Sequence, residues 1–381
     1  MHTSARHPDS YGVPQAGALL ARLGLGEFVP GRIRALPGRN ASWSGPTLSG
    51  RHVFVKQLQG PAEDSLQRFR RALAFEETAV RAVQPRLCSP PLLGHCESER
   101  LLVHACLDAR SGADLLADRA WDASLSQALG RTVAAVHMLP LQPDTAGDAA
   151  PPLLPPLHLL DALPEQGYLM ASQAELELWG LLQRDTELVE SLRRLRESER
   201  RAPRRPSHCD LRLDQVLVHE GKPILVDWEE FRCADPARDI GSVVGELLWT
   251  AVTRIPAARD DTAAASEIVS GPVSAHDIAA AGAREWQRLR PLATAFWHGY
   301  RHTDESRRPE PDEPRKPDEP DPHLAERACG FAGWHLLDRV LAHAGEQARL
   351  PATGRAAVGI GRRILTAPHD TIAVLGLTEA S

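Results

Sequence analysis

The chain has 381 residues, of which 43% are hydrophobic and 25% charged, an ordinary balance for a folded globular protein. Lysine and arginine number 44 against 50 aspartate and glutamate residues, and the net charge of −6 argues against a nucleic-acid partner. The six cysteines form no CxxC pair, so we expect a reducing cytoplasm with neither zinc knuckle nor disulfide framework. No apolar run approaches the roughly 20 residues of a membrane helix, so no membrane partner is expected.

The N-terminal part of the chain predicts a small sheet behind a polar leader. In chain order we expect a flexible leader at 1–15, a short helix at 16–25 and turn-separated strands within 29–58. The clearest strand covers 52–58, and its alternation puts Val53 and Val55 on one face and Lys56 on the other. Lys56 therefore shares its face with apolar neighbours.

A helix is predicted next, over 62–83. Apolar residues recur at helical spacing along one stripe, namely Leu66, Phe69, Leu73, Val80 and Val83. Glu76 falls in the same stripe, and a carboxylate on a buried face needs a partner because an unpaired buried charge is costly. We expect that partner to be Lys56, with Glu77 as the nearest alternative to Glu76.

The chain then changes from strands to helices. A short apolar strand at 101–107 precedes a helix start at 111–115, and this join predicts an N-terminal β-rich lobe at 16–107 and a helical lobe at 108–381. Further helices are predicted at 125–139, 173–196, 241–252, 275–300 and 323–344. The proline-rich charged segment 303–322 is expected to be a disordered loop. The predicted fold class is therefore α+β with two lobes.

Polar residues mark the ends of a predicted hairpin in the helical lobe. Asp210 precedes one short apolar strand, and Asp227 follows the next one after a Gly-Lys-Pro turn. Phosphoryl transfer needs an acceptor-orienting base, magnesium ligands and positive charge near the phosphates. Asp210 suits the first role, Asp227 with Gln215 the second, and Lys56 the third.

These motifs carry a resemblance. HxDxxxxN followed by an aspartate after the next strand is the signature of protein kinases and of the aminoglycoside phosphotransferase family, and here it reads HCDLRLDQ and then VDWEE. The later run DPARDI is more similar to the aminoglycoside phosphotransferases. The resemblance implies a bilobal kinase-like fold that uses ATP and Mg2+. Cys209 stands where that family usually has glycine, and Gln215 replaces asparagine, so its carbonyl oxygen is placed differently.

Three further residues, His208, Arg212 and Asp239, can be given structural roles in this frame. Arg212 stands where serine/threonine protein kinases carry a phosphate-steadying lysine, although it could be a surface arginine. His208 is expected to brace the loop and not to act as the general base. Asp239 is expected to hold the catalytic loop or to cap the helix that follows.

A closer resemblance covers most of the first lobe. Residues 20–58, then RRALAFEE, LLGHCESERLLVH and DARSGADLL, are similar to the kinase-like subunits of class V lanthipeptide synthetases. This implies phosphorylation of Ser or Thr in a leader–core precursor peptide, with lyase and cyclase subunits as partners. In that frame Asn40, Ser42 and Trp43 belong to a turn over the ATP phosphates. No GxxxxGK[ST] motif is present, which argues against a P-loop kinase.

Two other functions remain open. The acceptor could be a small molecule such as an aminoglycoside, for which Asp185, Glu187 and Glu190 offer a weak acidic pattern. The chain could also be a pseudokinase adaptor that binds a leader peptide or the lyase, and Gln215 is the best support for that alternative.

Overall fold

The computed structural model describes residues 13–81, 89–140, 155–254, 275–306 and 321–378. The chain divides into two compact units, one comprising 1–115 with 214–232 and the other 116–213 with 233–381. Sequence patterns put the division at residue 107 and the whole hairpin in the second lobe, whereas 214–232 joins the first unit. The predicted leader, up to residue 12, and the predicted loop, over 307–320, lie outside the described residues.

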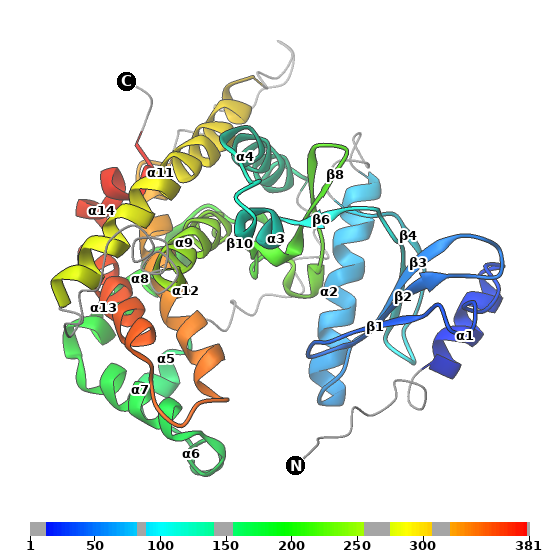
Figure 1. Ribbon diagram of the computed structural model, residues 1–381, viewed down its shortest axis with the longest axis horizontal. Coiled ribbons are helices and arrows are strands. Elements are labelled where there is room, and N and C mark those ends of the chain that lie inside the picture. Colours follow the sequence, from blue (N-terminus) through cyan, green and yellow to red (C-terminus); the bar gives the residue numbers. More distant parts are fainter. Residues whose placement is uncertain (1–12, 82–88, 141–154, 255–274, 307–320, 379–381) are drawn as a thin grey trace, which may run out of the picture. The chain divides into compact units, whose positions relative to one another are not determined.

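The first unit is built on an antiparallel five-stranded sheet (Figure 1). In the order β1-β2-β3-β5-β4, the strands are β1 (Arg34–Leu36), β2 (Ala41–Pro46), β3 (His52–Gln57), β5 (Leu101–Ala105) and β4 (Leu92–Cys96). The predicted strand at 52–58 is therefore the central one. Val53 and Val55 are buried while the alternate residues Phe54 and Lys56 are only partly buried, which explains the clear alternation of its sequence.

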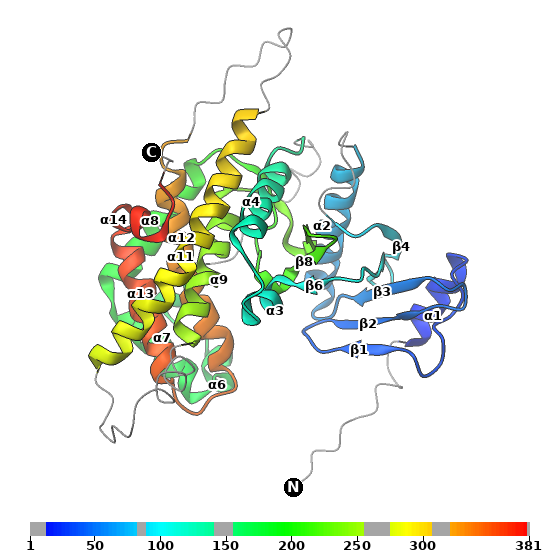
Figure 2. The ribbon, with the colours of Figure 1, turned by 45° about the horizontal axis from the view of Figure 1, so that its top comes forward.

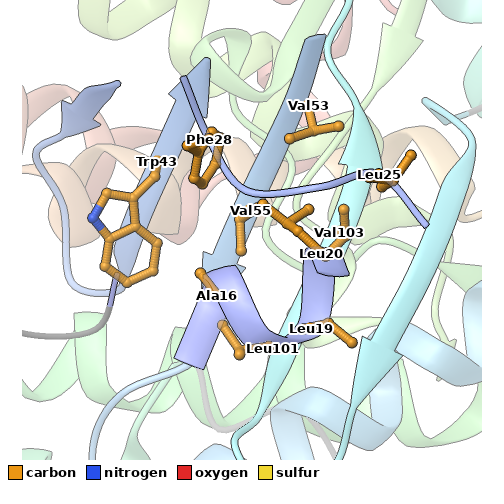
Figure 3. Close-up of a cluster of buried hydrophobic side chains, with 10 residues drawn as sticks. All are labelled: Ala16, Leu19, Leu20, Leu25, Phe28, Trp43, Val53, Val55, Leu101 and Val103. Atoms are coloured by element: carbon orange, nitrogen blue, oxygen red, sulfur yellow. The ribbon is translucent and has the colours of Figure 1, made fainter. Parts of the chain in front are cut away.

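Each face of the sheet has its own apolar cluster. Helix α1 (Val13–Arg22) covers one face, where Val53 and Val55 pack with Leu19, Leu20 and Trp43 (Figure 3). Helix α2 (Ala62–Arg81) covers the other, where Phe69 and Ala72 pack on Leu58 and Leu102. The predicted alternation in β3 is thus confirmed. The predicted apolar stripe of α2 is wrong at Val80, which is 72% exposed, and its last member, Val83, lies outside the described residues.

The hairpin that carries Asp227 forms a second, smaller sheet in this unit. Strand β8 (Val216–His219) pairs with β9 (Lys222–Leu225) and with β6 (Arg110–Ser111). A short 3-10 turn (Trp228–Glu230) follows the hairpin and packs on α2, where the rings of Phe75 and Trp228 stack at 3.5 Å. Because α2 also packs on the large sheet, this contact ties the residues after Asp227 to the strand that carries Lys56.

The second unit is mainly helical (Figure 2). Its helices are α4 (Ala123–His137), α5 (Leu157–Asp161), α6 (Glu165–Met170), α7 (Gln173–Arg184), α8 (Thr186–Arg201), α9 (Ala237–Thr253), α11 (Ala275–Ser306), α12 (Leu324–Ala344), α13 (Ala352–Thr366) and α14 (Pro368–Leu375). Helix α3 (Gly112–Ala117) spans the boundary between the units, and β7 (Arg205–Ser207) pairs with β10 (Arg232–Ala234). No described helix is long and apolar enough to cross a bilayer.

The helical predictions differ from the structure in several places, and α5 and α6 are among the helices that were not predicted. The helix predicted over 173–196 is two helices, because Asp185 ends α7 and its carboxylate accepts a hydrogen bond from Leu188 N to cap α8. Helix α11 continues to Ser306, past the predicted start of the charged loop. The last two helices, α13 and α14, lie in a part of the sequence for which no helix was predicted.

Helix α9 packs against α12 at the centre of this unit. Gly245 permits the approach, because a β-carbon there would lie 2.6 Å from the β-carbon of His335. Gly241 does the same one turn earlier against Phe331. The two helices therefore lie close together beside the loop that carries Asp210.

Candidate active site

Lys56 is held between two carboxylates in the first unit. Its ammonium group is paired with Asp227 Oδ1 and lies 3.0 Å from Glu229 Oε2, and its side chain is only 12% exposed. Burial alone would lower the pKa of Lys56, but the charges and hydrogen bonds of Asp227 and Glu229 raise it above its ordinary value. Lys56 therefore stays protonated at neutral pH, as a phosphate-binding cation must.

The predicted pair between Lys56 and Glu76 is wrong. Glu76 Oε1 instead lies 3.3 Å from His104 Nε2 on β5. His104 pairs across the strands with Phe54, so Glu76 reaches a point about 7 Å along β3 from Lys56. Glu77 is exposed and offers no alternative partner. A cofactor-binding role for Glu76 stays a prediction.

Glu229 is the centre of a hydrogen-bonded cluster that sequence analysis missed. Asn40 Nδ2 donates to Glu229 Oε2 at 2.8 Å, and the fully buried Arg68 donates to Glu229 Oε1 at 3.4 Å and to Asn40 Oδ1 at 3.2 Å. A buried guanidinium needs such partners to offset its desolvation. Glu229 could have been found from the sequence as the second residue after Asp227 in VDWEE. Arg68 lies within a charged helix segment, where nothing in the sequence distinguishes it from its neighbours.

The three residues predicted to form a turn over the ATP phosphates have different surroundings in the structure. Asn40 is buried and its side chain supports Glu229, while Ser42 pairs across the strands with Lys56. Trp43 is 4% exposed in the cluster under α1, so the prediction that it contacts the phosphates is wrong. The alternation of β2 explains this, because adjacent residues in a strand face opposite sides. Cofactor contacts of Asn40 and Ser42 stay predictions.

The two predicted metal ligands lie at adjoining ends of the hairpin strands. Val226 N donates to Gln215 O at 3.0 Å, which places Gln215 beside the residue that precedes Asp227. Asp227 itself has φ of +73°, so the chain turns sharply there. Among the described residues, no group of three or more His, Cys, Asp or Glu side chains gathers as a metal site. Oxygen donors from one carboxylate and one amide nevertheless fit magnesium, which commonly takes its other ligands from water and phosphate.

The loop that carries Asp210 is anchored at its start by Asp239 of α9. His208 N and Cys209 N each donate to the Asp239 carboxylate at 2.8 Å, and His137 Nε2 lies 3.0 Å from it. Burial would raise the pKa of Asp239, but the hydrogen bond and charge of His137, with the charge of His208, lower it below the ordinary value. The expectation that Asp239 holds the catalytic loop is confirmed.

Cys209 adopts a conformation that suits glycine. Its φ is +67°, in the left-handed region that L side chains rarely occupy. This conformation turns two consecutive backbone N–H groups, those of His208 and Cys209, toward the carboxylate of Asp239. It also accounts for the glycine usual at this position in the family that the motif resembles.

The end of the same loop is held by a second carboxylate of α9. Leu213 N lies 3.5 Å from Glu246 Oε2, and His335 Nε2 of α12 lies 2.8 Å from Glu246 Oε1. Asp239 and Glu246 are two helical turns apart, so one face of α9 holds both ends of the loop.

Asp210 lies between these anchors and remains accessible. Its side chain is 36% exposed, and Arg212 Nη1 donates to Asp210 Oδ2 at 2.7 Å. The structure thus places Arg212 on the carboxylate predicted to orient the acceptor. Its contact with the transferred phosphate stays a prediction.

The acidic pattern considered for a cationic acceptor is occupied by arginines. Arg362 of α13 pairs with Asp185 and lies 2.7 Å from Glu187, and Arg194 lies 3.9 Å from Glu190. The hydrogen bond from Arg362 is the main cause of the lowered pKa of Asp185. Asp185 and Glu187 thus join the start of α8 to α13, whereas the pair of Glu190 with Arg194 lies within α8.

Comparisons with known proteins agree with this geometry. Residues 47–292 match the sequence model of the phosphotransferase enzyme family, and no curated protein matches the chain significantly. An amicoumacin kinase bound to AMP-PNP and Ca2+ is similar at TM-score 0.52 and 13% identity, covering 96% of this chain and 95% of its own. An ethanolamine kinase from Plasmodium vivax is similar at TM-score 0.51 and 12% identity, covering 88% and 83%.

At these identities the structural likeness shows the fold, a small β-sheet lobe and a helical lobe of the kinase-like type. The matched residues run from before Lys56 to beyond Asp239, so they include both carboxylate clusters described above. The chain therefore belongs to the phosphotransferase enzyme family and is an ATP-dependent phosphotransferase that acts on hydroxyl groups.

Proposed function

We propose that this enzyme phosphorylates Ser or Thr hydroxyls of a ribosomal precursor peptide in lanthipeptide biosynthesis of the class V type. A separate lyase subunit would then eliminate phosphate to leave a dehydroamino acid. The support is the resemblance of residues 20–58 and three later segments to the kinase-like subunits of those synthetases. The proposal includes a leader–core peptide with lyase and cyclase subunits as partners, and a cytoplasmic location.

The residues present suit the chemistry of this transfer. Asp210 accepts the proton of the acceptor hydroxyl as its oxygen bonds to the γ-phosphorus, while the bond from that phosphorus to the ADP oxygen breaks. Lys56 contacts the phosphates, and Asp227 with the Gln215 side-chain oxygen would hold Mg2+, which when bound neutralises phosphate charge. Arg212, which donates a hydrogen bond to Asp210, would steady the transferred group.

One observation favours a peptide over a polycationic small molecule. The acids at Asp185, Glu187 and Glu190 are paired with Arg362 and Arg194, and a pattern neutralised in this way does not attract cations. The catalytic loop has two accessible acids, Asp214 and Asp210, and the reaction itself requires Asp210. A neutral hydroxyl-bearing side chain meets no electrostatic obstacle there.

The direct test combines the protein with ATP, Mg2+, a Ser/Thr-rich precursor peptide and the lyase, and follows peptide mass. Phosphorylated peptide is expected without the lyase and dehydrated peptide with it. Asp210→Asn should abolish both products. An unchanged peptide mass under every combination would exclude the proposal.

Two alternatives make different predictions. A small-molecule phosphotransferase would confer resistance on an aminoglycoside-sensitive host, and the peptide would stay unmodified. A pseudokinase adaptor, for which the longer side chain of Gln215 is the supporting feature, would keep pathway output after Asp210→Asn. Each result separates its hypothesis from the peptide kinase.

A further inference from the structure

The two acidic partners of Lys56 are not equally free to stay with it. Asp227 is 27% exposed and is the carboxylate that would hold Mg2+. An acid whose oxygens bind a metal ion no longer neutralises a neighbouring cation in full. Because Lys56 is only 12% exposed, it needs an anion that remains when Asp227 turns to the metal. Glu229 Oε2, which lies 3.0 Å from Lys56 Nζ, supplies that anion.

Glu229 is held through both of its carboxylate oxygens. Asn40 Nδ2 donates to Oε2 at 2.8 Å, the oxygen that also contacts Lys56, and Arg68 Nη1 lies 3.4 Å from Oε1. The preceding residue, Trp228, is buried, and the turn that carries it packs on α2. Because its backbone and both oxygens have partners, Glu229 offers Lys56 a fixed position.

Arg68 of α2 organises this arrangement from a fully buried place. Its Nε donates to Asp64 Oδ2 at 3.0 Å, its Nη1 donates to Asn40 Oδ1 at 3.2 Å, and its Nη2 donates to Gln59 O. Asn40 Oδ1 also accepts from Gln59 N at 3.1 Å. These partners offset the desolvation of the guanidinium. Arg68 and Asn40 therefore tie Glu229 to α2 and to the residue that precedes β2.

Helix α2 itself supplies no carboxylate to Lys56. Glu76, the predicted partner, lies 3.3 Å from His104 Nε2 and accepts a hydrogen bond from Ser89 Oγ at 3.5 Å. Among the described residues, the ion pairs of Lys56 are those with Asp227 and Glu229. The turn after β9 thus provides both anions.

We infer that Glu229, braced by Arg68 and Asn40, is the positioning residue that keeps Lys56 in place for the ATP phosphates while Asp227 binds the metal. Glu229 acts through Lys56 and not on the substrate. The inference concerns the nucleotide and holds for any acceptor, so its failure would leave the proposed function standing, and failure to phosphorylate a peptide would leave this inference standing.

Labelling of amino groups measures how firmly Lys56 is held. The chain has three lysines, Lys56, Lys222 and Lys316, so mass spectrometry after brief acetylation with an N-hydroxysuccinimide ester resolves each one, and the exposed Lys222 is an internal reference. The full-length Asp227→Asn variant reproduces the loss of that partner's charge to a metal. Lys56 should still be labelled more slowly than Lys222 in it, and adding Glu229→Gln should raise the Lys56 rate several-fold.

Glu230→Gln in the same background is the matched control. Glu230 pairs with Arg71 of α2 and with Arg232, so this variant weakens the contact between the turn and the helix without removing a partner of Lys56. Faster Lys56 labelling in both variants, or in neither, overturns the inference. If thermal melting shows that Glu229→Gln does not fold, Glu229→Asp replaces it, because its shorter side chain keeps the charge but withdraws it from Lys56.

Calorimetric binding of ATP with Mg2+ separates positioning of the lysine from direct metal ligation by Glu229. Glu229→Gln should weaken binding about tenfold, as expected for the loss of one hydrogen bond to a charged group, while Glu230→Gln should bind as the wild type does. In Lys56→Met, where no ammonium group is left to position, adding Glu229→Gln should cause no further loss. A further loss in that background would show that Glu229 acts on the metal or nucleotide directly, and would overturn the inference.

Discussion

The carboxylates predicted to act on substrate and metal differ sharply in their surroundings from those that hold the catalytic loop. Asp210 and Asp227 are 36% and 27% exposed, and their carboxylates pair with the cations Arg212 and Lys56. Asp239 and Glu246 are buried, each bound both to backbone N–H groups of the catalytic loop and to a histidine from another helix. Accessibility therefore separates the acids available to substrates from those that give the loop its shape.

The largest effect is expected from Asp210→Asn. Loss of the group that accepts the hydroxyl proton should lower the rate of phosphoryl transfer by about 10²–10⁴-fold. Stability should hardly change, because an exposed ion pair such as that with Arg212 contributes about 0–1 kcal/mol. Steady-state rates and thermal melting measure both, with Asp214→Asn, an exposed acid of the same loop, as the control. Substantial unfolding of Asp210→Asn would contradict the distinction drawn above.

Asp239→Ala, in contrast, should mainly lower the stability of the protein. It leaves two buried N–H groups and His137 without their partner, and removing one member of such a buried cluster costs about 3–5 kcal/mol of unfolding free energy. Asp227→Ala should cost less than this, since Lys56 keeps Glu229 as a partner. Urea denaturation compares the two, and equal losses would show that burial does not distinguish their roles.

The effect of Asp338 on stability at different pH values provides a further test of this comparison. Asp338 is a partly buried acid that does not hold the catalytic loop. Its folded-state pKa is raised, chiefly by burial, so its charged form opposes folding. That opposition is complete above the folded-state pKa and disappears below the unfolded value of about 3.9. Asp338→Asn should therefore stabilise the protein at neutral pH, with the gain vanishing near pH 4. Unfolding free energies measured across this range that show no gain at pH 7 would refute the assignment.

The smallest effect is expected at Cys209. Replacing Cys209 with glycine removes the cost of the left-handed backbone conformation, which is about 1–2 kcal/mol. Glycine also makes the unfolded chain more flexible, which destabilises the folded state by about 0.5–1 kcal/mol. Cys209→Gly should therefore stabilise by at most about 1.5 kcal/mol, while Cys209→Ala, which keeps its β-carbon, should not. Denaturation midpoints of the two variants measure the difference, and a gain in the alanine variant alone would exclude backbone strain as the cause.

Local patterns were sufficient for much of the fold. The alternation that places Val53 and Val55 on one face of β3 depends only on strand geometry, and the hairpin before Asp227 depends on a turn between two short apolar runs. Helix boundaries were least secure where a capping residue such as Asp185 interrupts a continuous helical pattern. The pair of motifs around Asp210 and Asp227 was visible because their spacing in sequence is short.

What the sequence by itself determined is the identity of the acids, Asp210 and Asp227, and of the cation, Lys56, because each belongs to a motif or a strand readable over a few residues. Tertiary structure alone decided their partners. Lys56 pairs with Asp227 and Glu229 instead of Glu76 because the 3-10 turn after β9 packs on α2. Trp334 and Asp338 line a small cavity beside Asp210 only because α12 packs closely on α9. Contacts between segments distant in sequence leave no local pattern, so packing had to reveal them.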